Sequence, residues 1–176
     1  MRDLDAIWLL IVIAATFALH EAAHGLAGQA MGYKTYVRVN SSGLTEGQKA
    51  TPAHEQIMTA AGPAVTIGQG AVGLILAVAF GWRGAFAIVF SALMMCSLAA
   101  VASLRTPNDE ARLGLAWDMG FWTVHTLVIA ILLVMTLIAW RRLNLSLRYV
   151  ATAFPIACFG MGAAVVAEPY LPTLHL

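Results

Sequence analysis

The sequence has little charge of either sign. Lys and Arg together number 10 and Asp and Glu 9 among 176 residues, so charged residues make up 11% of the chain and the formal net charge is +1. Soluble domains carry about 25% charged residues. With a mean hydropathy of +0.79, the chain is not expected to be a soluble domain or to bind nucleic acid, and we expect it to lie in a lipid bilayer.

Cysteine is also scarce. Cys96 and Cys158 both lie in apolar stretches, where a thiol packs as a small buried side chain. A disulfide framework is therefore not expected. Nor is a cleaved signal peptide, because Asp3 and Asp5 interrupt a basic leader, and cleavage after the first apolar stretch would remove or sever the polar segment HEAAH.

Long apolar runs are abundant. A membrane-spanning helix needs about 20 mostly apolar residues, and five stretches qualify, at 6–29, 54–80, 84–104, 120–140 and 148–168. We therefore expect an all-α polytopic membrane protein whose second and third spans form a hairpin around the short joint 81–84. The spans divide the basic residues equally between the two sides, so the positive-inside rule gives no orientation.

The first span contains a polar cluster, His20-Glu21-x-x-His24. Histidines at i and i+4 share a helical face, so one metal ion can bind both. Glu21 lies about 100° around the helix from His20, where it can act as general base on a metal-bound water. The simpler interpretations are a chance match or hydrogen bonds between helices. An ionisable side chain in mid-bilayer costs on the order of a few kcal/mol, so three together favour a metal site.

A catalytic zinc site needs a third protein ligand and an open position. The third span runs in the same direction as the first and ends in LRTPNDEARLG. Asp109 is the preferred ligand because Pro107 breaks the helix just before it. Glu110 is the nearest alternative and Asp118 a weaker one, while a plain solvated loop is the simplest interpretation. Two imidazoles and a carboxylate suit one Zn²⁺ per chain, although iron or cobalt would accept them too.

Other polar or helix-breaking residues lie near the same depth. Gly62 and Pro63 lie early in the second span. Proline leaves a backbone carbonyl without a hydrogen-bond donor, and glycine lets another backbone approach closely. The pair indicates either helix packing or part of a substrate or oxyanion region. His54 and His125 are candidates for stabilising an oxyanion or gating water, with hydrogen-bonded interface histidines as the alternative. Glu168 marks the end of the fifth span or, alternatively, supplies the third ligand.

The connection after the first span contains a strand-like segment, Tyr33–Asn40, followed by SSG as an expected turn. An exposed strand edge there would hold an unwound peptide by strand addition. The alternative is an interfacial loop anchored by tyrosines.

These motifs resemble the site-2 protease family of intramembrane zinc metalloproteases. The resemblance covers roughly residues 6–112 and rests on HEAAH, AAGP and PNDE, with Glu110 standing where the family's turn has glycine. It implies that Asp109 completes a zinc site with His20 and His24, near the cytosolic face. It also implies a metalloprotease-like core at 1–112, two additional spans at 113–176, and hydrolysis of peptide bonds in transmembrane protein substrates.

Two other functions are compatible with these residues. One is an inactive relative that binds or regulates partner helices, against which retention of Glu21 argues. The other is a small metal-handling membrane protein, which predicts ionisable residues along a path to the opposite side. The third and fifth spans contain almost none in their middles, so an active protease is the favoured function, with a regulatory partner left open.

Overall fold

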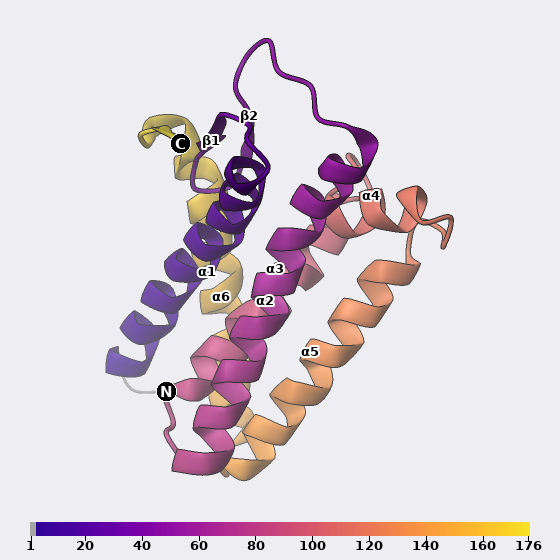
Figure 1. Ribbon diagram of the computed structural model, residues 1–176. Coiled ribbons are helices and arrows are strands. Elements are labelled where there is room, and N and C mark those ends of the chain that lie inside the picture. Colours follow the sequence, from indigo (N-terminus) through magenta and orange to yellow (C-terminus); the bar gives the residue numbers. More distant parts are fainter. Residues whose placement is uncertain (1–2) are drawn as a thin grey trace.

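The computed structural model describes residues 3–176, which form six α-helices, one 3-10 helix and three short strands (Figure 1). The α-helices are α1 (Asp3–Ala30), α2 (Pro52–Phe80), α3 (Ala85–Ala102), α4 (Asp109–Ala116), α5 (Thr123–Arg142) and α6 (Leu147–Ala167). The 3-10 helix η1 (Glu168–Tyr170) follows α6, and the strands are β1 (Thr35–Val37), β2 (Ser42–Leu44) and β3 (Leu174–His175). The expected all-α architecture with a small strand segment is confirmed.

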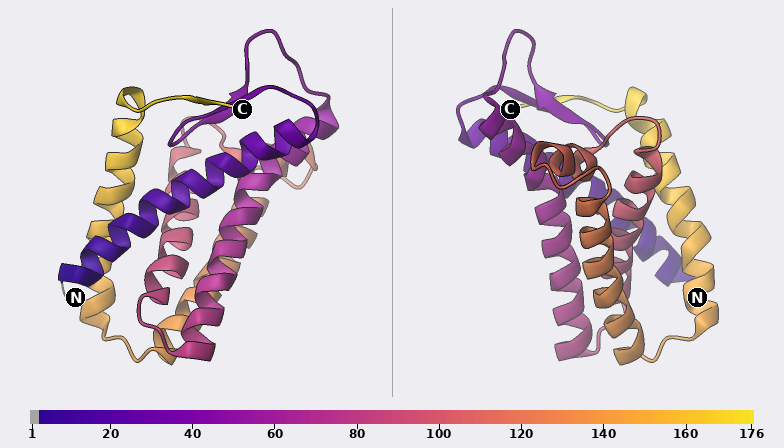
Figure 2. Two further views of the ribbon diagram at one scale, coloured as in Figure 1. Left: turned by 60° about the vertical axis from the view of Figure 1, so that its left-hand side comes forward. Right: turned by 90° about the vertical axis from the view of Figure 1, so that its right-hand side faces the viewer.

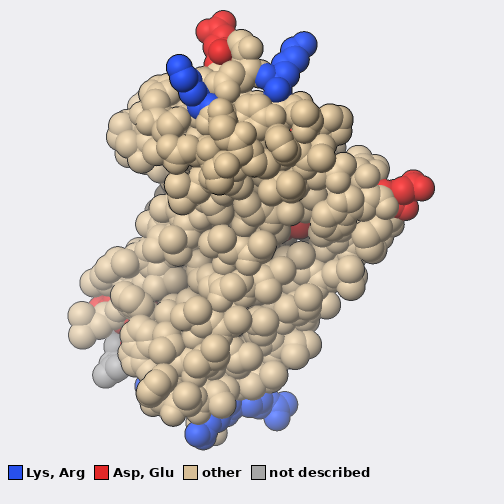
Figure 3. Space-filling model, in the orientation of Figure 1, with Lys and Arg blue, Asp and Glu red and all other residues tan. Residues whose placement is uncertain are grey.

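Within residues 3–176, five helices are long and apolar enough to cross a membrane, namely α1, α2, α3, α5 and α6. They coincide with the five expected spans. Lys, Arg, Asp and Glu gather toward the two ends of the molecule and leave a broad, nearly uncharged belt on the face seen in Figure 3. Such a belt matches the hydrocarbon core of a bilayer, and these features are those of a multi-pass membrane protein.

The helices form a bundle in which α2, α3 and α5 pack against one another. Helix α1 crosses this group obliquely and packs against α2, α3 and α6 (Figure 2). Close helix approach depends on small residues, since a Cβ at Gly73 of α2 would lie only 2.6 Å from the Val89 side chain of α3. Small residues at helix interfaces are typical of membrane bundles, where van der Waals packing drives association.

Local signals in the sequence set both ends of α2. Thr51 caps its start by accepting a hydrogen bond from the backbone N–H of His54, and Pro52 occupies the first turn. Gly81 ends the helix with a φ of 62°, a left-handed conformation that glycine adopts without a steric penalty. The chain then reverses into α3, so the expected hairpin forms.

A three-stranded sheet covers the end of α1, in the order β2-β1-β3 with both pairs antiparallel. The expected turn at SSG is wrong: the reversal comes earlier, where the N–H of Arg38 donates to the carbonyl of Ser41 at 2.7 Å. Ser42 therefore pairs opposite Val37 as part of β2. The pairing of the chain's end, β3, with β1 was not predicted.

Candidate metal centre

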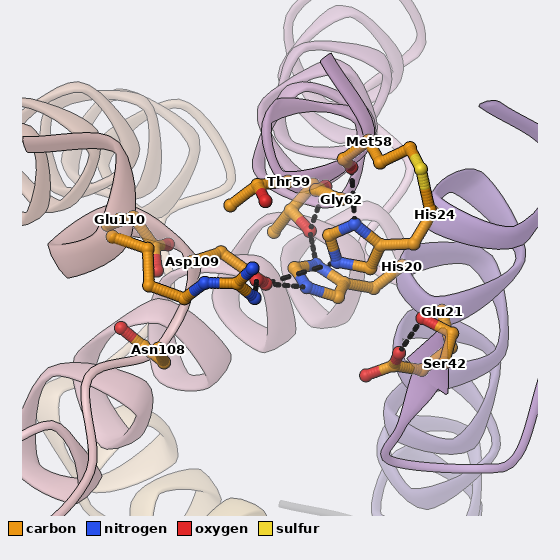
Figure 4. Close-up of polar contacts among 12 residues, drawn as sticks. His20, Glu21, His24, Ser42, Met58, Thr59, Gly62, Asn108, Asp109 and Glu110 are labelled. Carbon is orange, nitrogen blue, oxygen red and sulfur yellow. Dashed lines mark hydrogen bonds and ion pairs between the residues drawn. The ribbon is translucent and has the colours of Figure 1, made fainter. Parts of the chain in front are cut away.

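Three side chains from two distant parts of the chain converge between α1 and α4 (Figure 4). His20 Nε2 and His24 Nε2 each lie 3.1 Å from Oδ2 of Asp109. These three residues form a group within residues 3–176 whose ligand atoms all lie within 4.8 Å of one another. Ligand atoms in a tetrahedral zinc site with bonds of 2.0–2.1 Å are about 3.3 Å apart. The two distances to Asp109 are close to this value, so the three residues could hold a single zinc ion.

The other nitrogen of each imidazole already has a partner. His24 Nδ1 donates to the carbonyl of Met58 at 2.6 Å, and His20 Nδ1 lies 2.9 Å from Oγ1 of Thr66. Because the Thr66 hydroxyl donates its own hydrogen to the carbonyl of Gly62 at 3.1 Å, it accepts the Nδ1 hydrogen of His20. Such outer partners fix the tautomer and orient metal-binding histidines.

This arrangement calls for a cation. With Nδ1 protonated on both neutral rings, each Nε2 presents a lone pair toward the same carboxylate oxygen of Asp109. Three electron-pair donors so close together repel one another unless a proton or a metal ion lies between them. The donor set, two imidazoles and one carboxylate, suits zinc and leaves a fourth position for water. The residues present therefore fit the expected ion.

The approach of α2 to the histidines depends on Gly62. A Cβ at this position would lie 2.6 Å from Nε2 of His20 and closer still to Nε2 of His24. The next residue, Pro63, has no N–H to bond the carbonyl of Thr59 one turn earlier. Gly62 thus brings the backbone of α2 against the two rings, at the depth expected from the sequence.

A short loop after α3 positions the third ligand. Asn108 precedes α4 and bonds twice with Ser103, since the Ser103 hydroxyl donates to Oδ1 at 2.6 Å and accepts from the Asn108 N–H at 3.2 Å. Asp109 is the first residue of α4. Burial opposes its ionisation, but when a proton lies on each facing Nε2, the hydrogen bonds from His20 and His24 outweigh burial and hold the pKa of the Asp109 carboxyl well below its usual range.

Glu21 is buried on α1 beside the two histidines and accepts a hydrogen bond from the Ser42 hydroxyl at 2.7 Å. Ser42 belongs to β2, one of the two edge strands of the sheet, whose outer edge is unpaired among the described residues. Figure 4 shows Glu21 and Ser42 together, on the side of the histidines away from α2. The candidate general base is therefore held by a residue of the edge strand.

The candidate ligands and Glu21 line a cavity of about 710 Å³. Its walls come from α1, α2, α3, α4 and the segment from Asn40 to Leu44, which includes all of β2. A volume of this size falls in the range of typical ligand sites.

Three of the other candidate residues lie away from the three ligand atoms. His54 accepts or donates a 2.9 Å hydrogen bond with the Tyr33 hydroxyl, outside the cavity. His125 is 2% exposed and bonds Ser103 at 3.2 Å. Glu110 is also 2% exposed, and its carboxylate lies 3.9 Å from Nδ1 of His125. Burial, reinforced by the charge of Asp109, raises the pKa of Glu110.

The last two candidates are peripheral. Glu168 accepts a hydrogen bond from the Ser41 hydroxyl and so ties the end of α6 to the hairpin of β1 and β2. Asp118 is exposed in the turn after α4 with a φ of 55°. Asp109 alone of the acidic candidates joins the two histidines in the described group.

Several residues at the site were not anticipated from the sequence. Ser42, Thr66 and Ser103 orient the base, a histidine and the ligand loop respectively. The sequence contained one signal for Thr66. It lies four residues after Gly62, and residues four apart share a helical face. Arg112, one turn after Asp109, also lines the cavity.

Comparison with known proteins adds no relative. No family model matches the chain, and no curated protein or solved structure matches it.

Proposed function

We propose that this chain is an intramembrane zinc metalloprotease that hydrolyses peptide bonds of membrane-embedded protein substrates. The observation that carries the proposal is the convergence of His20, His24 and Asp109 beside the buried Glu21, in a cavity at one end of the membrane-spanning helices. The likeness of the HEAAH, AAGP and PNDE motifs to the site-2 protease family supports the same function.

Each residue has a chemical role in this proposal. Zinc bound by His20, His24 and Asp109 would lower the pKa of a water molecule and polarise the substrate carbonyl. Glu21 accepts the water proton as general base and later gives it to the leaving amine. The Ser42 hydroxyl holds one oxygen of Glu21, which leaves the other free to take the proton.

The proposed substrate is a transmembrane segment that unwinds before cleavage. A helix keeps its carbonyls in internal hydrogen bonds, so a peptide must become extended to present one to the site. Strand β2 lines the cavity and has an unpaired edge among the described residues. An extended substrate would add to this edge as a further antiparallel or parallel strand, with its carbonyl close to Glu21.

We also propose that the cavity lies nearer the cytosolic face of the membrane, as the family resemblance implies. The loop that joins β2 to α2 would then be cytosolic. A cysteine placed at the exposed Glu46 of this loop should react with a membrane-impermeant maleimide in inverted vesicles and not in intact cells. The opposite pattern would contradict this orientation.

Metal content tests the zinc site directly. Detergent-purified wild type should contain about one zinc per chain by elemental mass spectrometry, and His20→Ala and Asp109→Ala should lose it. Asp118→Asn is a matched control because it removes a carboxylate from the turn after α4 that makes no part of the group, and asparagine tolerates a positive φ. Well-folded wild type without metal would contradict the proposal.

Catalysis is tested with Glu21→Gln, which removes the base and preserves its size. With fluorescently labelled β-casein, an unfolded protein, as probe, wild type should cleave while Glu21→Gln should not, although it retains zinc. Cleavage by Glu21→Gln at the wild-type rate would refute the role of the base. Zinc bound by a wild type that cleaves neither casein nor co-expressed membrane proteins would indicate a metal-binding protein without protease activity.

A further inference from the structure

The cavity contains a cation that the proposed chemistry has not yet used. Arg112 lies one turn after Asp109 on α4 and lines the cavity. Its Nη1 lies 3.9 Å from Oδ1 of Asp109, and its Nη2 donates to Glu55 Oε1 at 2.9 Å. Asp109 therefore faces both histidines through one oxygen and the guanidinium through the other.

Peptide hydrolysis creates a need for such a group. Attack on the carbonyl places negative charge on its oxygen, and enzymes commonly direct N–H donors to that oxygen. Both Nδ1 hydrogens of the candidate ligands and the Ser42 hydroxyl already have acceptors. The side chain of Asn108, which also lines the cavity, is held through its Oδ1 by the Ser103 hydroxyl and carries no charge. His125 and His54 lie outside the cavity.

The contacts of Arg112 leave its guanidinium available. Its partner in the ion pair, Glu55, is 61% exposed, and the Arg112 side chain is 46% exposed. Exposed ion pairs contribute little to stability and are easily exchanged. Arginine presents five N–H donors in a planar fork, so Arg112 can retain one contact while another N–H reaches a substrate oxygen.

We propose that Arg112 is a further catalytic residue that stabilises the oxyanion formed during peptide hydrolysis, an inference that rests on the proposed function. The water oxygen bonds to the carbonyl carbon, the water proton passes to Glu21, and the carbonyl π pair becomes a lone pair on oxygen. Arg112 donates N–H hydrogen bonds to that oxygen. When the C=O bond re-forms, the C–N bond breaks and the amine leaves with the proton from Glu21.

The first test compares two zinc-binding inhibitors of different geometry, so that the outcome does not depend on turnover. A phosphoramidate peptide mimics the tetrahedral anion, whereas a peptide hydroxamate binds zinc without mimicking it. Arg112→Gln should retain one zinc per chain, weaken the phosphoramidate at least tenfold and change hydroxamate affinity less than twofold. Lys49→Gln is the matched control because Lys49 is another cation lining the same cavity, and it should leave both affinities unchanged.

The second test uses turnover of labelled β-casein. Arg112→Gln should lower kcat by about 100-fold with little change in KM, and Arg112→Lys should recover part of the loss. Added guanidinium chloride should restore activity to Arg112→Ala, while sodium chloride at equal ionic strength should not. Rescue of this kind shows that the reaction needs a guanidinium at the vacated position, and the inhibitor comparison separates a contact with the oxyanion from support of Asp109.

Three results would overturn the inference. Equal weakening of both inhibitors by Arg112→Gln would show that Arg112 supports the zinc site as a whole, and no weakening of either would remove any role. Wild-type cleavage that requires a free carboxylate at the substrate C-terminus, and is lost on amidation, would make Arg112 a carboxylate-binding residue. Absence of zinc from wild type would instead refute the proposed function itself.

Discussion

Substitution of Gly62 by alanine adds one methyl group at the point where α2 meets the candidate ligands. In most helix interiors this change stabilises a protein by about 0.8–1.0 kcal/mol because alanine has the higher helix propensity. At position 62 the new Cβ would point at the two imidazole rings. We therefore expect Gly62→Ala to keep its fold and lose its metal.

The size of the effect follows from the distances. The new Cβ would lie 2.6 Å from His20 Nε2, whereas ordinary van der Waals contact begins at 3.4 Å, so the ring must withdraw by about 0.8 Å. Metal–ligand distances in a working site hold within about 0.2 Å. The rings are also fixed by Thr66 and Met58, so they cannot withdraw and keep these partners. Zinc affinity should fall at least about 100-fold.

The assay is competition for zinc with a chelator of known affinity, performed on detergent-purified protein alongside a thermal melt. Gly68→Ala is the matched control, because Gly68 lies in the same helix and a Cβ there would meet no atom within 4 Å. Gly68→Ala should bind zinc as wild type does. Wild-type zinc affinity in a folded Gly62→Ala would refute the reasoning that Gly62 admits the histidines.

Three further predictions concern the surroundings of the ligands. Ser42→Ala removes the hydrogen bond to Glu21 and should lower kcat for casein about tenfold without loss of zinc, as checked by kinetics and metal analysis. Thr66→Val keeps the shape but leaves His20 Nδ1 without its acceptor, so zinc affinity should fall 10- to 100-fold, measured by chelator competition. Burial raises the pKa of Glu110, so its stabilising contribution is complete below its unfolded pKa and is lost as pH rises. Glu110→Gln should therefore gain Tm over wild type at pH 8 and not at pH 4.

The membrane spans were predictable because their signal is local. Length and apolar composition suffice to require a helix in a bilayer, where backbone groups must bond within the segment. The shared face of His20 and His24 follows from helical periodicity in the same way. Predicting Asp109 as a ligand required one further step, because the direction of the third span decides on which side of the membrane Asp109 lies. The structure brings Asp109 to the two histidines.

Other features depend on contacts that no local pattern records. The turn was misplaced at SSG because three-residue strands are held by pairing with distant segments, including β3 at the end of the chain. The hydrogen bond between Ser42 and Glu21 requires the same register. Arg112 lies on α4 with an exposed side chain, but the sequence indicates only a polar connection there. Cations in such connections are usually solvated, so the position of Arg112 beside Asp109 gave no sequence signal.

The topology explains why the chemistry gathers at one depth. His20 lies ten residues before the end of α1, and Gly62 lies ten residues after the start of α2. Two helices joined on one side of the membrane bring such positions level, since each residue rises about 1.5 Å. The hairpin of α2 and α3 then returns the chain to the same side, where Ser103 and Asn108 turn Asp109 inward. The ionisable residues, which are costly in a bilayer, are thus delivered by α1 and α4 to one point, where the backbone of α2 packs against the two histidines.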